Sequence, residues 1–133
     1  MRDTFVIAPS GAGIQTLARV SGSGLYSHES PTSMVSGDGP QLVVIAEAQD
    51  VAQYYVEAPE SAAIRVCGDD PAFFHVRFRD HHAAAALIID LFKHLKSVIV
   101  DNDHGLLLSI SQFDKLTSDR PNWDWSTAES EVP

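Results

Sequence analysis

The chain has 133 residues, a size typical of one domain and sufficient to bury a hydrophobic core without metal or disulfide support. Its 44% hydrophobic and 20% charged residues exclude an intrinsically disordered chain, and its single cysteine excludes an internal disulfide. The formal net charge of −9 argues against direct binding of nucleic acid or of an anionic membrane surface.

The N-terminal half predicts short strands and one long loop. Three β-prone runs predict strands: residues 4–8, 41–46 and 62–66. Two other runs, 14–20 and 50–57, are compatible with either a short helix or a strand. Residues 21–40 are rich in Ser, Gly and Pro, and we expect them to form the long loop.

A strand followed by a helix is the clearest signal in the chain. Residues 73–79 alternate, so that Phe74, Val76 and Phe78 face the core of a half-buried strand. Asp80 then has the side chain of an N-cap. Apolar residues recur with helical spacing from Ala84 to Leu95 and predict one principal helix at about 81–96.

The C-terminal part predicts a hairpin, a short helix and a tail. The turn Asp-Asn-Asp-His-Gly at 101–105 joins strands at 98–100 and 106–110. Ser111 is the expected N-cap of a helix at 112–116, and residues 127–133 are expected to be disordered. The sequence therefore predicts an α+β fold in a single domain, 1–126, with a mainly antiparallel sheet packed against the principal helix.

Candidate metal ligands occur in the turn at 101–105 and at the start of the principal helix. The turn does not match a calcium loop, because the glycine and the glutamate needed at loop positions 6 and 12 are missing. A transition-metal site would form only if Asp80, His81 and His82 met this turn. The two histidines are adjacent on a helix, where side chains diverge by about 100°, so we expect solvent-facing residues and no metal or cofactor.

Cys67 and the two tryptophans have structural explanations as well as functional ones. Asp69 and Asp70 disfavour a reactive thiolate, so Cys67 is expected to be a small buried residue. Trp123 and Trp125 flank Asp124. Either indole closes the core, or an exposed indole among carboxylates forms a protein-binding hot spot, and the sequence leaves both explanations open.

Residues 74–125 resemble small bacterial immunity proteins that neutralise toxins delivered between competing cells by contact-dependent or type VI systems. The resemblance lies in the FHVRFRD strand, the Ala- and Leu-rich helix, the VIVDNDHGLLLS hairpin, Phe113 and the closing PNWDW. It implies a cytoplasmic protein without enzymatic activity that binds one cognate toxin and blocks its active site or substrate path. An acidic inhibitor suits a basic toxin such as a nuclease.

We expect no signal peptide and no membrane span, and the contact residues are predicted in two acidic patches. The first patch comprises Asp101, Asp103, His104, Asp119, Trp123, Asp124 and Trp125, and the second comprises Glu57, Glu60, Asp69 and Asp70. Two other functions stay open: a regulatory module that binds a basic protein, or a small metal-assisted hydrolase. The hydrolase would use His81, His82, Asp101, Asp103 and His104.

Overall fold

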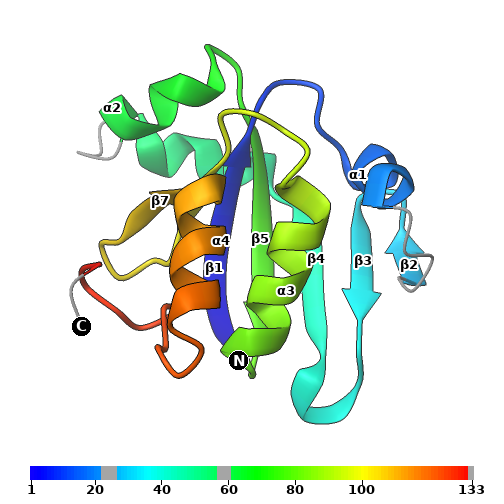
Figure 1. The fold of residues 1–133 in the computed structure, drawn as a ribbon. Coiled ribbons are helices and arrows are strands. Elements are labelled where there is room, and N and C mark those ends of the chain that lie inside the picture. The colour runs from blue at the N-terminus through cyan, green and yellow to red at the C-terminus, as the bar shows by residue number, and fades with distance from the viewer. Residues whose placement is uncertain (22–26, 57–60, 132–133) are drawn as a thin grey trace.

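An antiparallel sheet organises the fold (Figure 1). The computed structural model describes residues 1–21, 27–56 and 61–131, and the strands in this part lie in the order β2-β3-β4-β5-β1-β6-β7. The strands are β1 (Arg2–Ala8), β2 (Ser27–Ser30), β3 (Ser33–Ser36), β4 (Val43–Glu47), β5 (Ala72–Phe78), β6 (Ile99–Asp101) and β7 (Leu107–Ser109). Every neighbouring pair is antiparallel, which confirms the predicted α+β class.

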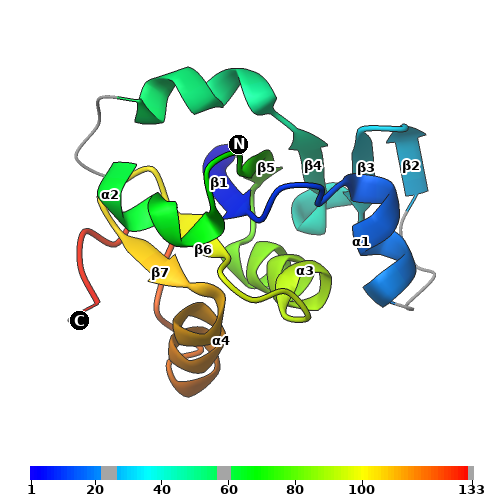
Figure 2. The ribbon, with the colours of Figure 1, turned by 90° about the horizontal axis from the view of Figure 1, so that it is seen from above.

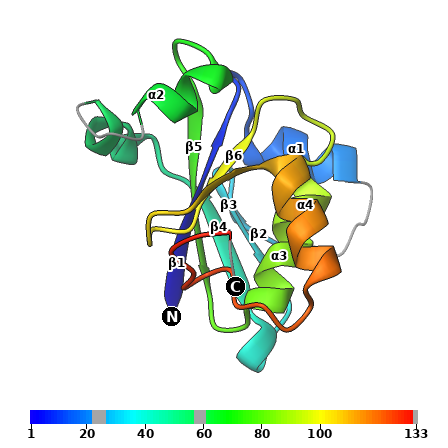
Figure 3. The ribbon, with the colours of Figure 1, turned by 60° about the vertical axis from the view of Figure 1, so that its left-hand side comes forward.

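The helical elements divide between the two faces of the sheet. They are α1 (Ile14–Ser21), α2 (Ser61–Ile64), α3 (His81–Phe92) and α4 (Ile110–Asp119), with 3-10 turns η1 (Gly39–Gln41), η2 (Gln49–Tyr55) and η3 (Arg65–Cys67). Figure 3 shows α1, α3 and α4 on one face and α2 on the other, and Figure 2 shows η2 also on the side away from α3. Among the described residues, no helix combines the length and the apolar character needed to cross a membrane.

Strand β5 lies at the centre of the sheet, and one of its faces is buried from Phe74 to Phe78. Phe74, Val76 and Phe78 are fully buried in the larger core, beneath α3, as predicted. Phe73 faces the opposite side and joins a smaller core with Ile7 and the helical turns there. This pattern fixes the register, since a slip of one residue would bring the exposed Arg77 to the larger core.

Helix α3 begins as predicted but ends four residues earlier. The Asp80 carboxylate accepts a hydrogen bond from the backbone N–H of His82 at 2.9 Å and caps the helix. The helix ends at Phe92, not at residue 96. Ser97 adopts a positive φ of 66°, because the chain must reverse there to bring Val98 into the core beneath the helix. The apolar residues keep their helical spacing as far as Leu95, beyond the end of the helix, so the sequence did not show where the helix ends.

Helix α4 corrects the predicted N-cap. Ser109, and not Ser111, caps the helix, which covers 110–119 and not 112–116. The Ser109 hydroxyl accepts from the Gln112 N–H, while the Gln112 side chain accepts from the Ser109 N–H. This reciprocal pair is a capping box, which needs serine and glutamine three residues apart. Only Ser109 has that spacing.

Several predictions in the N-terminal half are wrong or are now decided. The stretch 21–40 contains a hairpin, β2–β3, within its described residues, so it is not one long loop. Residues 62–66 are helical and not a strand, because a short helix lets Ile64 and Cys67 cover the smaller core. The ambiguous runs 14–20 and 50–57 are helical where described.

The C-terminal segment 127–131 is held against the domain, contrary to the disorder predicted for 127–133, of which 132 and 133 lie outside the described residues. The carbonyl of Ala128 accepts from the Asn102 amide at 2.7 Å, and Ala128 packs against the larger core. The carbonyl of Glu131 accepts from the Arg120 guanidinium. These contacts are long-range, which is why a tail without apolar periodicity gave no sign of them.

Candidate functional site

The turn of the β6–β7 hairpin is held in place by hydrogen bonds to the Asp101 carboxylate. Asp103 and Gly105 adopt positive φ values of 63° and 97°, as the predicted turn requires. Asp101 is only 8% exposed, and its Oδ2 accepts a 2.5 Å hydrogen bond from the hydroxyl of Tyr55 in η2. Its Oδ1 accepts from the Asp103 N–H at 2.9 Å. Asp101 therefore secures η2 to the hairpin, and its prediction as a partner contact is wrong.

Asn102 ties the same turn to the C-terminal segment. Its amide nitrogen donates to the carbonyls of Trp125 and Ala128, both at 2.7 Å. Its side-chain oxygen accepts from the N–H groups of His104 at 2.9 Å and Leu106 at 3.1 Å. The side chain is 2% exposed, and all four of its hydrogen bonds are made within the protein.

Trp125 closes the larger core and is not a contact residue, which corrects that prediction. It is 1% exposed, stacks on Phe78 with ring centroids 5.5 Å apart, and meets Phe113 edge-on at 4.8 Å. Its indole N–H donates to the carbonyl of His81 at 3.1 Å. Trp123 stays half-buried, with the Arg120 guanidinium 5.6 Å from its ring centroid. The structural explanation thus holds for one tryptophan of the pair.

Asp124 is held by three partners, two of them from distant parts of the chain. Its carboxylate lies 2.7 Å from the Arg2 guanidinium and 3.6 Å from Nδ1 of His81, and it accepts from the Ser126 hydroxyl at 2.5 Å. Burial alone would raise the pKa of Asp124, but the Ser126 hydrogen bonds and the nearby charges of His81 and Arg2 lower it below 3.8. Burial lowers the pKa of His81 below 6.5, with Asp124 opposing this. Asp124 thus joins β1, α3 and the C-terminal segment.

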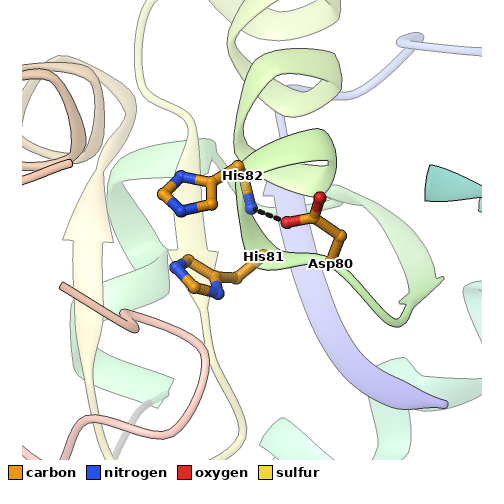
Figure 4. A group of neighbouring side chains, drawn as sticks. All are labelled: Asp80, His81 and His82. Atoms are coloured by element: carbon orange, nitrogen blue, oxygen red, sulfur yellow. Dashed lines mark hydrogen bonds between the residues drawn. The ribbon is translucent and has the colours of Figure 1, made fainter. Parts of the chain in front are cut away.

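The start of α3 brings three potential metal ligands together (Figure 4). Asp80, His81 and His82 each offer a ligand atom, and these atoms lie within 4.8 Å of one another. The imidazoles do not diverge as predicted, since their centroids lie 4.1 Å apart with planes tilted by 35°. Imidazole nitrogen lone pairs lie in the ring plane, so rings this close to parallel do not direct both lone pairs at one ion. Figure 4 shows the Asp80 carboxylate on the other side of the helix start, where it serves as the cap.

The residues proposed for a metal-assisted hydrolase are not assembled. Asp101 lies on the face of the sheet that carries Tyr55, whereas His81 and His82 begin the helix on the opposite face. In the part of the chain that the structure describes, the group at 80–82 is the one cluster of three or more metal-ligand side chains. Asp103 and His104 are exposed at the turn and do not join it.

The chain between β4 and β5 forms a separate surface, which we name the 49–70 lobe after its residues, with 57–60 outside the described part. The exposed large hydrophobic side chains of the described residues are Met1 and three in this lobe: Tyr54 at 69%, Val56 at 74% and Val66 at 56%. Asp50, Asp69 and Asp70 are exposed beside them in the sequence. The lobe thus combines exposed apolar groups with negative charge.

The smaller core holds the 49–70 lobe to the sheet. Val51, Tyr55, Ile64 and Cys67 point inward and pack with side chains of β1, β5 and β6. The Cys67 thiol is 3% exposed and donates to the carbonyl of Ile7 at 3.4 Å. Burial raises its pKa to about 11, and the position of the side chain confirms the expectation of a small buried residue.

The two predicted acidic patches differ in how many of their residues are exposed. In the first patch Asp103, His104 and Asp119 are exposed, but Asp101 and Trp125 are buried, and Asp124 is engaged in ion pairs. In the second patch Asp69 and Asp70 are exposed, whereas Glu57 and Glu60 lie outside the described residues.

Sequence reasoning missed Tyr54, Val56 and Val66. A signal existed for Tyr54, because Val51 and Tyr55 lie four residues apart and define the inward face of a short helix. A helical interpretation of 50–57 places Tyr54 off that face. Comparison of the chain with known protein families, with curated proteins and with solved structures found no match.

Proposed function

We propose that this protein is a non-enzymatic immunity protein, which acts in the cytoplasm by binding a basic toxin protein and blocking its active site or substrate path. The observation that carries the proposal is the 49–70 lobe. Exposed Tyr54, Val56 and Val66 are grouped there in one chain excursion together with exposed carboxylates. Exposed apolar side chains amid charge are typical of protein-binding surfaces.

The charge of the lobe suits a basic partner. Residues 49–70 contain five acidic residues, Asp50, Glu57, Glu60, Asp69 and Asp70, and one basic residue, Arg65. Negative charge speeds encounter with a basic protein, whereas a desolvated tyrosine slows dissociation. The lobe therefore offers both elements of a tight inhibitory interface.

The attachment of the lobe supports binding without large rearrangement. Tyr55 is fixed by its hydrogen bond to Asp101, and Val51, Ile64 and Cys67 pack on the sheet. A surface already held in place loses less conformational entropy on binding. Non-catalytic inhibition also agrees with the unsuitable geometry of the histidines at 81 and 82.

The experiment co-expresses the chain with the toxin candidate encoded beside its gene and measures both growth and the dissociation constant. Tyr54→Ala should raise the dissociation constant by about 30-fold, since a hot-spot tyrosine contributes about 2 kcal/mol. The double variant Asp69→Lys with Asp70→Lys should slow association and weaken its dependence on salt. Both variants change exposed side chains, so the fold should persist.

Trp123→Ala is the matched control, because it removes an aromatic side chain from the other predicted patch. It should leave binding unchanged if the 49–70 lobe is the interface. If Trp123→Ala lost binding and Tyr54→Ala kept it, the interface would lie at the first acidic patch and not at the 49–70 lobe. Absence of protection by the unaltered chain would refute the immunity function itself.

A further inference from the structure

An apolar pocket lies between α1 and α3, on the face of the sheet opposite the 49–70 lobe. The pocket has a cavity volume of about 270 Å³ and is lined by the loop 9–12 and by both helices. Its apolar side chains include Ala12, Leu17, Leu91 and Leu95. Leu17 and Leu91 belong to the buried core, so the floor of the pocket is the core itself.

Water fills such a pocket poorly. The lining offers few polar groups, among them the Thr16 hydroxyl and the His94 imidazole, whereas a stable buried water needs two to four polar partners. A hydrocarbon group that displaced this water would gain about 25 cal/mol for each Å² of apolar surface it covers. The volume lies just below that of pockets for drug-sized ligands, which suits one short chain.

One basic side chain, His94, lines the pocket, and other basic residues lie near the lining residues in the sequence, although the chain carries a net charge of −9. His94 lines the pocket and is exposed, and it is flanked in sequence by exposed Lys93 and Lys96. Arg19 lies three residues after Thr16 on the same side of α1. The nearest carboxylate along α3, Asp90, does not line the pocket.

We propose that the α1–α3 pocket binds a small amphipathic carboxylate, with its alkyl chain against Leu17, Leu91 and Leu95 and its head group at His94. The apolar lining selects the alkyl chain, and His94 with the neighbouring Lys93 and Lys96 favours an anionic head over a neutral or cationic one. This site is independent of the proposed toxin interface, since the 49–70 lobe occupies the opposite face of the sheet.

The test titrates ¹⁵N-labelled protein with sodium octanoate and follows the backbone amide signals. Saturable shifts are expected at Ala12, Leu17 and Leu95, with n-octanol and octyltrimethylammonium each binding at least tenfold more weakly. Thr16→Phe should abolish these shifts, because an exposed helical position that lines the pocket would place its ring inside. Gln15→Phe, exposed on the same helix but outside the pocket, should leave them intact.

The head-group part is tested by placing a carboxylate at the position of His94. His94→Glu should weaken octanoate binding at least tenfold, whereas His104→Glu, which makes the same change at the hairpin turn, should not. Failure of octanoate to saturate in the millimolar range would overturn the proposal. Equal binding of octanoate by Thr16→Phe and Gln15→Phe would also overturn it, because that result indicates adsorption without a site. Equal affinity of the protein for octanoate and octanol would overturn it as well.

Discussion

Asn102→Asp is the substitution that most directly tests the link between the hairpin turn and the C-terminal segment. The change is nearly isosteric, so it creates no cavity. It keeps the side-chain oxygen that accepts from His104 and Leu106. It replaces the amide that donates to the carbonyls of Trp125 and Ala128 with an oxygen that cannot donate when ionised. Two carbonyls therefore lose a donor and face a negative charge.

The expected loss follows from this geometry. Leaving a buried polar group unsatisfied costs about 1–3 kcal/mol, so two such groups give roughly 4 kcal/mol. Asn102 is 2% exposed, which means that solvent does little to relieve the cost. A domain of this size is stable by about 5–15 kcal/mol, so the variant should fold at 25 °C but unfold at a clearly lower denaturant concentration.

The assay is equilibrium unfolding in urea, followed by tryptophan fluorescence, because buried Trp125 lies beside the broken contacts. Asn122→Asp introduces the same charge at an exposed position, and its free energy of unfolding should change by less than about 0.5 kcal/mol. If Asn102→Asp lost less than about 1 kcal/mol, the C-terminal segment would not be held by this side chain in solution.

Two further predictions concern titration and reactivity. Burial lowers the pKa of His81 below 6.5, so below that pH the unfolded state binds more protons at His81 than the folded state does. The stability that neutral His81 contributes is therefore fully present above pH 6.5 and is lost as the pH falls below it. His81→Asn should therefore flatten the decline in unfolding free energy between pH 7 and 5. Equal profiles for His81→Asn and the unaltered chain would contradict this. Cys67, with its pKa raised to about 11, should react with a thiol reagent at pH 8 only after unfolding, and rapid stoichiometric labelling of the native protein would refute its burial.

Local pattern predicted the elements whose signals repeat along the chain. The alternation at Phe74, Val76 and Phe78 and the cap at Asp80 are as expected, because both depend on neighbours close in sequence. The same reasoning failed at 62–66, where an apolar run forms a helix to cover the smaller core. It also extended α3 past Phe92, since periodicity does not show where the chain must turn to reach the next strand.

Site residues were harder to predict, because side-chain exposure depends on distant partners. Asp101 and Asp103 occupy the same predicted turn. Asp101 is buried and bonded to Tyr55, which lies 46 residues away in the chain, whereas Asp103 is exposed. Trp123 and Trp125 differ for the same kind of reason, as only Trp125 meets Phe78 and Phe113.

The sequence by itself determined the α+β class, the acidic character of the chain, the strand at 73–79 and the capped start of the principal helix, because these depend on composition and on neighbours close in sequence. Only the tertiary structure decided which polar and aromatic side chains remain at the surface. It buried Asp101 and Trp125 as structural contacts and exposed Tyr54, Val56 and Val66 on the 49–70 lobe. Burial is a property of the packed faces of the sheet, and those faces are assembled from strands far apart in the chain.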